Sequence, residues 1–229
     1  VLLACSSSDA LAQSLADRYS RAQSLADACR FNDAIAEAEG VLTQQDALGG
    51  PHLWQVEVSI ADWLRLDGRL SNAESRARVA LQAIEVNEPA GGVPAIRARS
   101  VHAAVLSALG RSDEAAAILS DARQSAEASA PESFQLAELW QQTATLELNR
   151  NRPVAALAAV SRSLDLLERR PGTEAFRRNL AMLRAIANLD NRNPDEAEKA
   201  IDNADLVASA VANDRSGAQR SLLRARSAI

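Results

Sequence analysis

Apolar residues recur every three or four positions along most of the chain, which is the spacing that gives an α-helix one apolar face. Leu11, Leu15, Tyr19, Ala22 and Leu25 show this spacing in the first such segment. Short polar stretches that contain Gly, Asn, Asp or Arg interrupt the pattern, so that the helical segments come in pairs. The pattern therefore predicts an all-α protein built from helix hairpins.

Stronger breaks group these hairpins into units, because proline and paired glycines cannot continue a helix. The breaks are Gly49-Gly50-Pro51, Pro89 to Pro94, Ala130-Pro131 and Pro171-Gly172. They predict units at about 9–50, 51–93, 94–130, 131–171 and 172–213, followed by a terminal helix at 216–229. We expect one repeat domain over residues 1–229 that is part of a longer protein.

The clearest bend within a unit lies at Gly110, between two apolar helical segments. Glycine suits the left-handed conformation after a helix, and Ser112 is predicted to cap the next helix. Ser71 and Glu74 have the spacing of a capping box, which predicts a helix start near Ser71. Pro153 and Pro194 are predicted to begin helices, since proline is favoured in a first turn.

Aligning the five bends produces columns that keep one register over all units. The turn column is Cys29, Gly68, Gly110, Asn151 and Arg192. Seven positions earlier stand Ala22, Ala61, Ala103, Ala144 and Ala185; five positions later stand Ala34, Ala73, Ala115, Ala156 and Ala197. Apolar residues follow at plus nine (Ala38, Ala77, Leu119, Val160, Ile201) and small ones at plus twelve (Val41, Ala80, Ala122, Ser163, Ala204). Such columns indicate helices that cross closely and units that cover one another's apolar faces.

The bends at Gly110–Ala116, Gly68–Ala73 and Asn193–Ala197 resemble the junction between the two helices of the tetratricopeptide repeat (TPR) family. The resemblance implies a right-handed superhelical array of about five helix-turn-helix repeats plus a terminal helix. Successive units are 39 to 42 residues apart, not the 34 usual for this family. The longer period resembles the variant repeats of kinesin light chains and of helical arrays in bacterial signalling proteins. HEAT repeats have a compatible length and remain the structural alternative, although the Gly-Arg-x-x-x-Ala bend favours the TPR interpretation.

In the TPR family, ligands usually bind the concave surface formed by the first helices. The resemblance therefore implies partner-binding candidates at Gln55, Val58, Asp62, Arg65, Arg97, Ser100, Ser107, Glu138, Gln141 and Thr145. This lining lacks the recurring Lys and Asn of the family's chaperone-tail clamps, so we do not expect a chaperone adaptor.

Composition and candidate chemistry argue against several function classes. The 25 Lys and Arg residues are spread along the chain with 30 Asp and Glu residues, a net charge of −5 that does not indicate a nucleic-acid surface. Cys5, Cys29, His52 and His102 lack the clustering of a metal site, and no serine or histidine has a recognisable catalytic partner. We expect no catalytic residue, no metal and no cofactor.

Two residue types have a structural and a functional interpretation. Arginine follows the turn residue at Arg30, Arg69, Arg111 and Arg152. We expect these arginines to satisfy carbonyls at the end of the preceding helix, with a basic ridge for an acidic partner as the alternative. Trp54 and Trp63, nine residues apart, point about 180° apart on one helix. We expect all three tryptophans, including Trp140, to pack in the core, with a peptide anchor as the alternative.

The sequence begins with Val1-Leu2-Leu3-Ala4-Cys5, which resembles the end of a bacterial lipoprotein signal. The preceding charged and apolar regions of such a signal are absent, so we expect a helix end and a cytoplasmic protein. The alternative is a periplasmic or membrane-anchored protein lipidated at Cys5. No apolar run approaches the ~20 residues that span a bilayer.

These patterns predict a non-catalytic scaffold that binds a peptide or helix of a protein partner, or another domain of its own polypeptide, within a bacterial signalling protein. A homodimer through the terminal helix is also compatible with the pattern. The alternatives are a small-molecule-sensing helical domain, a lipoprotein scaffold and, least favoured, a helical-array enzyme.

Overall fold

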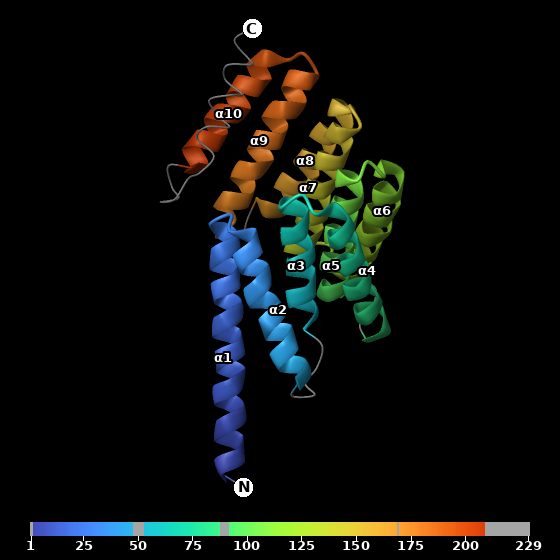
Figure 1. Ribbon diagram of the computed structural model, residues 1–229. Helices are drawn as coiled ribbons and strands as arrows, with labels where there is room; N and C mark the ends of the chain where they lie inside the picture. The colour runs from blue at the N-terminus through green and yellow to red at the C-terminus, as the bar shows by residue number, and fades with distance from the viewer. Residues whose placement is uncertain (1, 48–52, 88–91, 169, 209–229) are drawn as a thin grey trace. The chain divides into compact units, whose positions relative to one another are not determined.

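The computed structural model describes residues 2–47, 53–87, 92–168 and 170–208, which form ten α-helices (Figure 1). The chain separates into two compact units, Val1–Gly110 and Arg111–Ile229. The helices are α1 (Leu2–Asp27), α2 (Phe31–Ala47), α3 (Trp54–Leu66), α4 (Leu70–Asn87) and α5 (Val93–Ala108) in the first unit, and α6 (Ser112–Ser129), α7 (Phe134–Asn149), α8 (Pro153–Leu167), α9 (Glu174–Asp190) and α10 (Pro194–Ala208) in the second.

Consecutive helices pack on one another within each unit, as expected for an array of helix hairpins. In the first unit α3 also packs on α5, and in the second α7 packs on α9. These pairs are the first helices of successive hairpins. The order of helices within each unit therefore follows the predicted array of helix hairpins. The predicted terminal helix at 216–229, together with Pro51 and His52, lies outside the described residues.

The turn residues of all five bends adopt the left-handed conformation. Their φ angles are 58° at Cys29, 81° at Gly68, 79° at Gly110, 57° at Asn151 and 56° at Arg192. At the second bend the Gly68 amide donates to the Arg65 carbonyl and the Arg69 amide donates to the Leu64 carbonyl, at N–O distances of 3.1 and 2.9 Å. This pair of hydrogen bonds is the Schellman motif, which satisfies the last carbonyls of the helix.

The predicted helix start near Ser71 is confirmed, but neither Ser71 nor Ser112 is the capping residue. Helix α4 begins at Leu70 and α6 begins at Ser112, so Ser71 and Ser112 lie inside their helices. The capping position of α6 is Arg111, which makes no side-chain cap, and the Arg69 carbonyl accepts the first hydrogen bond of α4. The reason is that the next helix begins only two residues after the left-handed residue, so the arginine takes the capping position.

The predicted small-residue columns are buried in the core wherever the structure describes their side chains. The alanines seven positions before and five positions after the turn residue are at most 1% exposed. Ser163 belongs to the column at plus twelve and is fully buried, and its hydroxyl donates to the Ala137 carbonyl at 2.8 Å. That hydrogen bond links α8 to α7 and explains why a polar residue is tolerated there.

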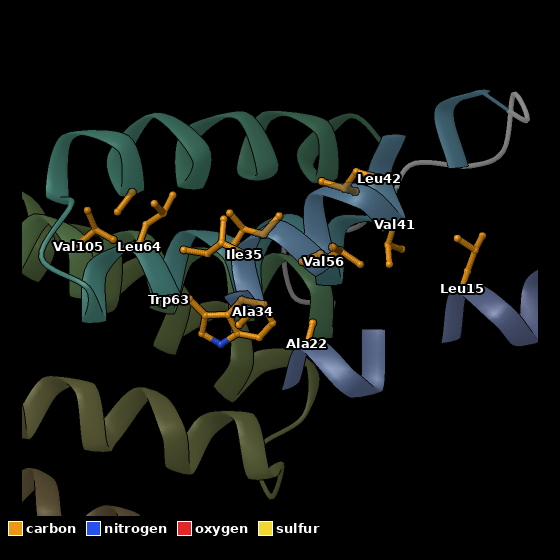
Figure 2. Close-up of a cluster of buried hydrophobic side chains, with 13 residues drawn as sticks. Leu15, Ala22, Ala34, Ile35, Val41, Leu42, Val56, Trp63, Leu64 and Val105 are labelled. Carbon is orange, nitrogen blue, oxygen red and sulfur yellow. The ribbon is translucent and has the colours of Figure 1, made fainter. Parts of the chain in front are cut away.

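The two tryptophans of α3 face different neighbours, as their spacing predicts. Trp63 is 8% exposed and lies in a cluster with Ala22, Ala34 and Ile35 of α1 and α2 (Figure 2). Trp54 packs against a separate cluster, to which α4 and α5 contribute. In the second unit the rings of Phe134 and Phe176 meet edge to face, with centroids 5.0 Å apart, and join α7 to α9.

Candidate functional site

The predicted partner-binding residues fall on α3 and α5 of the first unit and on α7 of the second. On α3, Gln55 is exposed, whereas Asp62 and Arg65 are half-buried. The Arg65 Nε donates to Asp62 Oδ1 at 2.9 Å, so these two side chains form a local ion pair one turn apart. They present a fixed pair of opposite charges at the surface.

Val58 does not share this exposure. It is 1% exposed and packs with Ala80, Ile84 and Ala95, between α3 and the helices α4 and α5. The sequence spacing placed Val58 near the exposed stripe of α3, but its apolar side chain turns to the flank that α4 covers. A partner on the surface of α3 would not reach it, so we leave Val58 out of the proposed surface.

Helix α1 covers part of the same side of α3. The Tyr19 hydroxyl lies 2.7 Å from Ser59 Oγ and donates to the Gln55 carbonyl at 3.3 Å. Ser59 is only 7% exposed as a result. Sequence reasoning missed this contact, because the two residues are 40 positions apart and neither has a distinctive neighbour.

On α5, Arg97 is exposed, and Ser100 and Ser107 are half-buried. Val93, which is 48% exposed, lies one turn before Arg97 on the same side of the helix. Helices α3 and α5, which carry these residues, pack side by side in the first unit. We call the exposed and half-buried predicted residues of α3 and α5 the first-helix face of the first unit, and those of α7 the first-helix face of the second unit.

On α7, Glu138, Gln141 and Thr145 are half-buried. At about 100° per residue they fall within about 60° of one another, so they share one side of the helix. The Thr145 hydroxyl donates to the Gln141 carbonyl at 3.2 Å, which leaves Gln141 and Glu138 as the longer polar side chains of this side. The structure therefore groups the three predicted residues of the second unit.

The arginines that follow the turn residues pair with nearby carboxylates. The ion pairs are Arg30 with Asp33 (2.6 Å), Arg69 with Asp67 (2.8 Å), Arg111 with Glu114 (2.6 Å) and Arg152 with Glu147 (3.8 Å). The carbonyls of the preceding helices are satisfied by the backbone amides of Arg30, Arg69 and Arg152. Any residue at this position would supply such an amide, so capping by the arginine side chains stays a prediction. The pairing of the guanidinium groups with carboxylates reduces the basic character of the alternative ridge.

Two pockets among the described residues of the second unit are open to solvent. One, of about 390 Å³, lies between α8, α9 and α10 and is lined by charged residues such as Arg177, Arg184 and Glu196. The other, of about 980 Å³, lies between α6, α7 and α8 and includes Trp140. Both have a mixed charged and apolar lining, unlike the closed apolar cavity that a small-molecule sensor would need.

Arg123 of α6 stacks on Trp140 of α7, with its guanidinium carbon 4.5 Å from the ring centroid. The same guanidinium donates to Thr143 Oγ1 at 2.7 Å. Burial lowers the pKa of Arg123 from its usual value, while the carboxylates of Glu127 and Glu147 act in the opposite direction. Arginine remains charged at neutral pH, so this is a cation–π contact between two helices.

Within the described part of the chain, no three His, Cys, Asp or Glu side chains are grouped so that they could hold a metal ion. Cys29 is exposed and His102 is half-buried. Among the described helices, none is long and apolar enough to cross a membrane.

No protein-family model and no curated protein matches this sequence. Solved structures do match it. BtubC (BKLC) from P. vanneervenii superposes with a TM-score of 0.66 at 15% identity, over 85% of this chain and 79% of that chain. A putative kinesin light chain from Podosopora anserina with nearly identical TPR-like repeats superposes with a TM-score of 0.61 at 13% identity, over 87% of this chain and 97% of that chain. A point variant of that protein has a TM-score of 0.63 at 14% identity, over 90% of this chain and 96% of the variant. The chain therefore has a TPR-type repeat fold similar to that of kinesin-light-chain-like proteins.

Proposed function

We propose that this chain is a non-catalytic scaffold whose first-helix face binds a peptide or a helix of a protein partner. The observation that carries the proposal is the side-by-side packing of α3 and α5, the helices that carry exposed Gln55 and Arg97 and half-buried Arg65. The burial of the small-residue columns supports it, because those columns build the array and leave the irregular residues of the first helices to contact a partner.

The chemistry of this face suits a polar peptide. Arg65 and Arg97 supply guanidinium groups for carboxylates or backbone carbonyls, and Ser100 and Ser107 add hydroxyls of small size. On α7, Gln141 and Glu138 can donate and accept hydrogen bonds. We place the scaffold in the cytoplasm, as the regulatory or signalling part of a longer bacterial polypeptide, where another domain of that polypeptide is a second candidate partner.

The test is a selection of peptides from a random phage-displayed library on the wild-type protein, followed by affinity measurements on variants. The variant Arg65→Gln, Arg97→Gln, Gln141→Ala should bind the selected peptides at least tenfold more weakly. The two arginine substitutions remove a positive charge, and Gln141→Ala removes a hydrogen-bonding amide. Far-UV circular dichroism should show an unchanged helix content.

The matched control is Arg78→Gln, Arg192→Gln, Gln124→Ala, which removes the same residue types from exposed positions elsewhere. Its affinity should stay within twofold of the wild-type value. Selected peptides that bind the first variant at full strength, or that lose affinity equally for the control, would contradict the assignment of the face.

A further inference from the structure

The pocket between α6, α7 and α8 lies on the side of α7 that faces away from the proposed partner-binding residues. Trp140 is two positions after Glu138, which places the two side chains about 200° apart on the helix. Leu136 lies one turn before Trp140 and also lines the pocket. We call this pocket the second-helix groove, because α6 and α8, the second helices of two successive hairpins, form its walls.

Apolar side chains form part of the lining of the groove. Leu136 and Trp140 of α7 contribute to it together with Leu166 of α8. Trp140 is only partly buried, although one face of its ring already carries the Arg123 guanidinium. The contact with Arg123 shows that the Trp140 ring accepts a stacked guanidinium.

Carboxylates surround these apolar residues. The groove is lined by four exposed carboxylates, Glu127, Glu132, Asp165 and Glu168. Glu127 lies near the end of α6, and Asp165 and Glu168 lie at the end of α8. Glu127 and Asp165 lie in the last turns of these helices, which have no basic residue, and Glu168 is the C-cap of α8. A helix C-terminus is the negative end of the helix dipole, so these carboxylates stand where a cation is favoured.

The Glu127 carboxylate interacts with the Arg123 guanidinium. The carboxylates of Glu132, Asp165 and Glu168 make no ion pair among the described residues. Two arginines also line the groove. The Arg170 guanidinium donates to the backbone carbonyl of Glu132. The other arginine of the lining is Arg162. Arg169 lies outside the described residues. The described lining carries four negative and two positive side chains, and the Arg123 guanidinium on the Trp140 ring is a third positive group, so the excess is one negative charge. This excess is complementary to a basic ligand.

We propose that the second-helix groove binds an arginine-containing segment of a protein partner, with an arginine of that segment against Trp140 and the carboxylates of α6 and α8 around it. The groove volume of about 980 Å³ is enough for a few side chains of such a segment. Arginine fits better than lysine, because its planar guanidinium stacks on an indole ring and pairs with carboxylates through two nitrogen atoms. This site is separate from the first-helix face.

The test uses fluorescence anisotropy of a fluorescein-labelled tetra-arginine peptide amide with the full chain. The wild-type protein should bind this peptide with an affinity that falls as salt is raised. The variant Glu127→Gln, Asp165→Asn, Glu168→Gln should bind at least tenfold more weakly. These three side chains are exposed, so the substitutions leave the core intact.

The control Asp46→Asn, Asp195→Asn, Glu198→Gln makes the same change of net charge at exposed positions outside the groove, and its affinity should stay within twofold of wild type. A tetra-lysine peptide should bind at least fivefold more weakly than tetra-arginine, and spermine should be a poor competitor. Trp140→Leu should remove most of the preference for arginine over lysine.

The first-helix variant, Arg65→Gln, Arg97→Gln, Gln141→Ala, should bind tetra-arginine as the wild type does, so that failure of one site is distinguished from failure of the other. Equal losses in the groove variant and its control, equal binding of the two peptides, effective competition by spermine, or an absence of tetra-arginine binding would each overturn the proposal.

Discussion

Replacement of Gly68 by alanine isolates the energetic role of the turn column. Gly68 has a φ of 81°, and a Cβ built on it meets no atom within 4 Å. The substitution therefore introduces no steric contact with the rest of the protein. Its effect on the free energy of unfolding comes from the left-handed backbone alone.

The expected magnitude follows from two opposing terms. A left-handed conformation costs a residue with a Cβ about 1–2 kcal/mol. Alanine also reduces the conformational entropy of the unfolded chain, which offsets about 0.4–1 kcal/mol of that cost. Gly68→Ala should thus destabilise the protein by about 1 kcal/mol, which for a chain of this size lowers the melting temperature by about 2–4 °C.

The measurement is urea and thermal unfolding followed by far-UV circular dichroism, with a series of variants at two bends. Gly68→Asn should cost less than Gly68→Ala, because asparagine tolerates the left-handed region better, and Gly68→Val should cost more. Arg192 has a φ of 56° in the equivalent position, so Arg192→Gly should be neutral or stabilising. A neutral Gly68→Ala together with a destabilising Arg192→Gly would refute the reasoning.

Two further predictions concern ion pairs of the first unit. Arg76 of α4 contacts both carboxylate oxygens of Glu57, at 3.0 and 3.2 Å, and Glu57 is 7% exposed. Arg76→Ala should destabilise the protein by on the order of 3 kcal/mol in urea unfolding, because it leaves a buried carboxylate without its cation. Adding Glu57→Gln should recover part of this loss. The control Arg78→Ala removes an exposed arginine and should cost little, and equal effects of Arg76→Ala and Arg78→Ala would contradict this account. The hydrogen bond from Arg18 holds the pKa of Glu37 below its ordinary value, with a smaller contribution from Arg21, so ¹³C NMR titration should show a larger upward shift of this pKa in Arg18→Gln than in Arg21→Gln. Because the native pKa of Glu37 is lowered, the stabilisation from this ion pair is present above the unfolded-state pKa and is lost as the pH falls through the native pKa. An unchanged Glu37 pKa in Arg18→Gln would contradict this prediction.

The helix ends show where sequence reasoning worked and where it did not. The register of alanines and turn residues predicted five bends, and all five turn residues have positive φ angles, including the non-glycine residues Cys29, Asn151 and Arg192. The caps at Ser71 and Ser112 were wrong, because capping depends on how many residues separate the left-handed residue from the next helix. A side-chain cap is found instead at α7, where Ser133 Oγ accepts from the Leu136 amide at 3.2 Å. Ser133 lies in the connection between α6 and α7, outside the turn column.

The candidate surfaces divide in the same way. Glu138, Gln141 and Thr145 lie on one side of α7, since helix geometry alone sets which residues share a side, and their role in partner binding stays a prediction. Val58 is buried instead of exposed, because burial at that position depends on α4 and α5, which pack against it. The second-helix groove has no sequence signature, since its lining comes from three helices and two connecting segments.

By itself, the sequence determined the all-α class, the five hairpins, the turn positions and the small residues at helix crossings, because these depend on local conformation and on a repeat that each unit restates. Only the tertiary structure decided which polar residues meet. Arg76 joins Glu39 and Glu57 from helices up to 37 residues away, and Trp140 receives Arg123 from the preceding helix. Such contacts depend on how three helices pack in space, and no spacing along one helix encodes that arrangement.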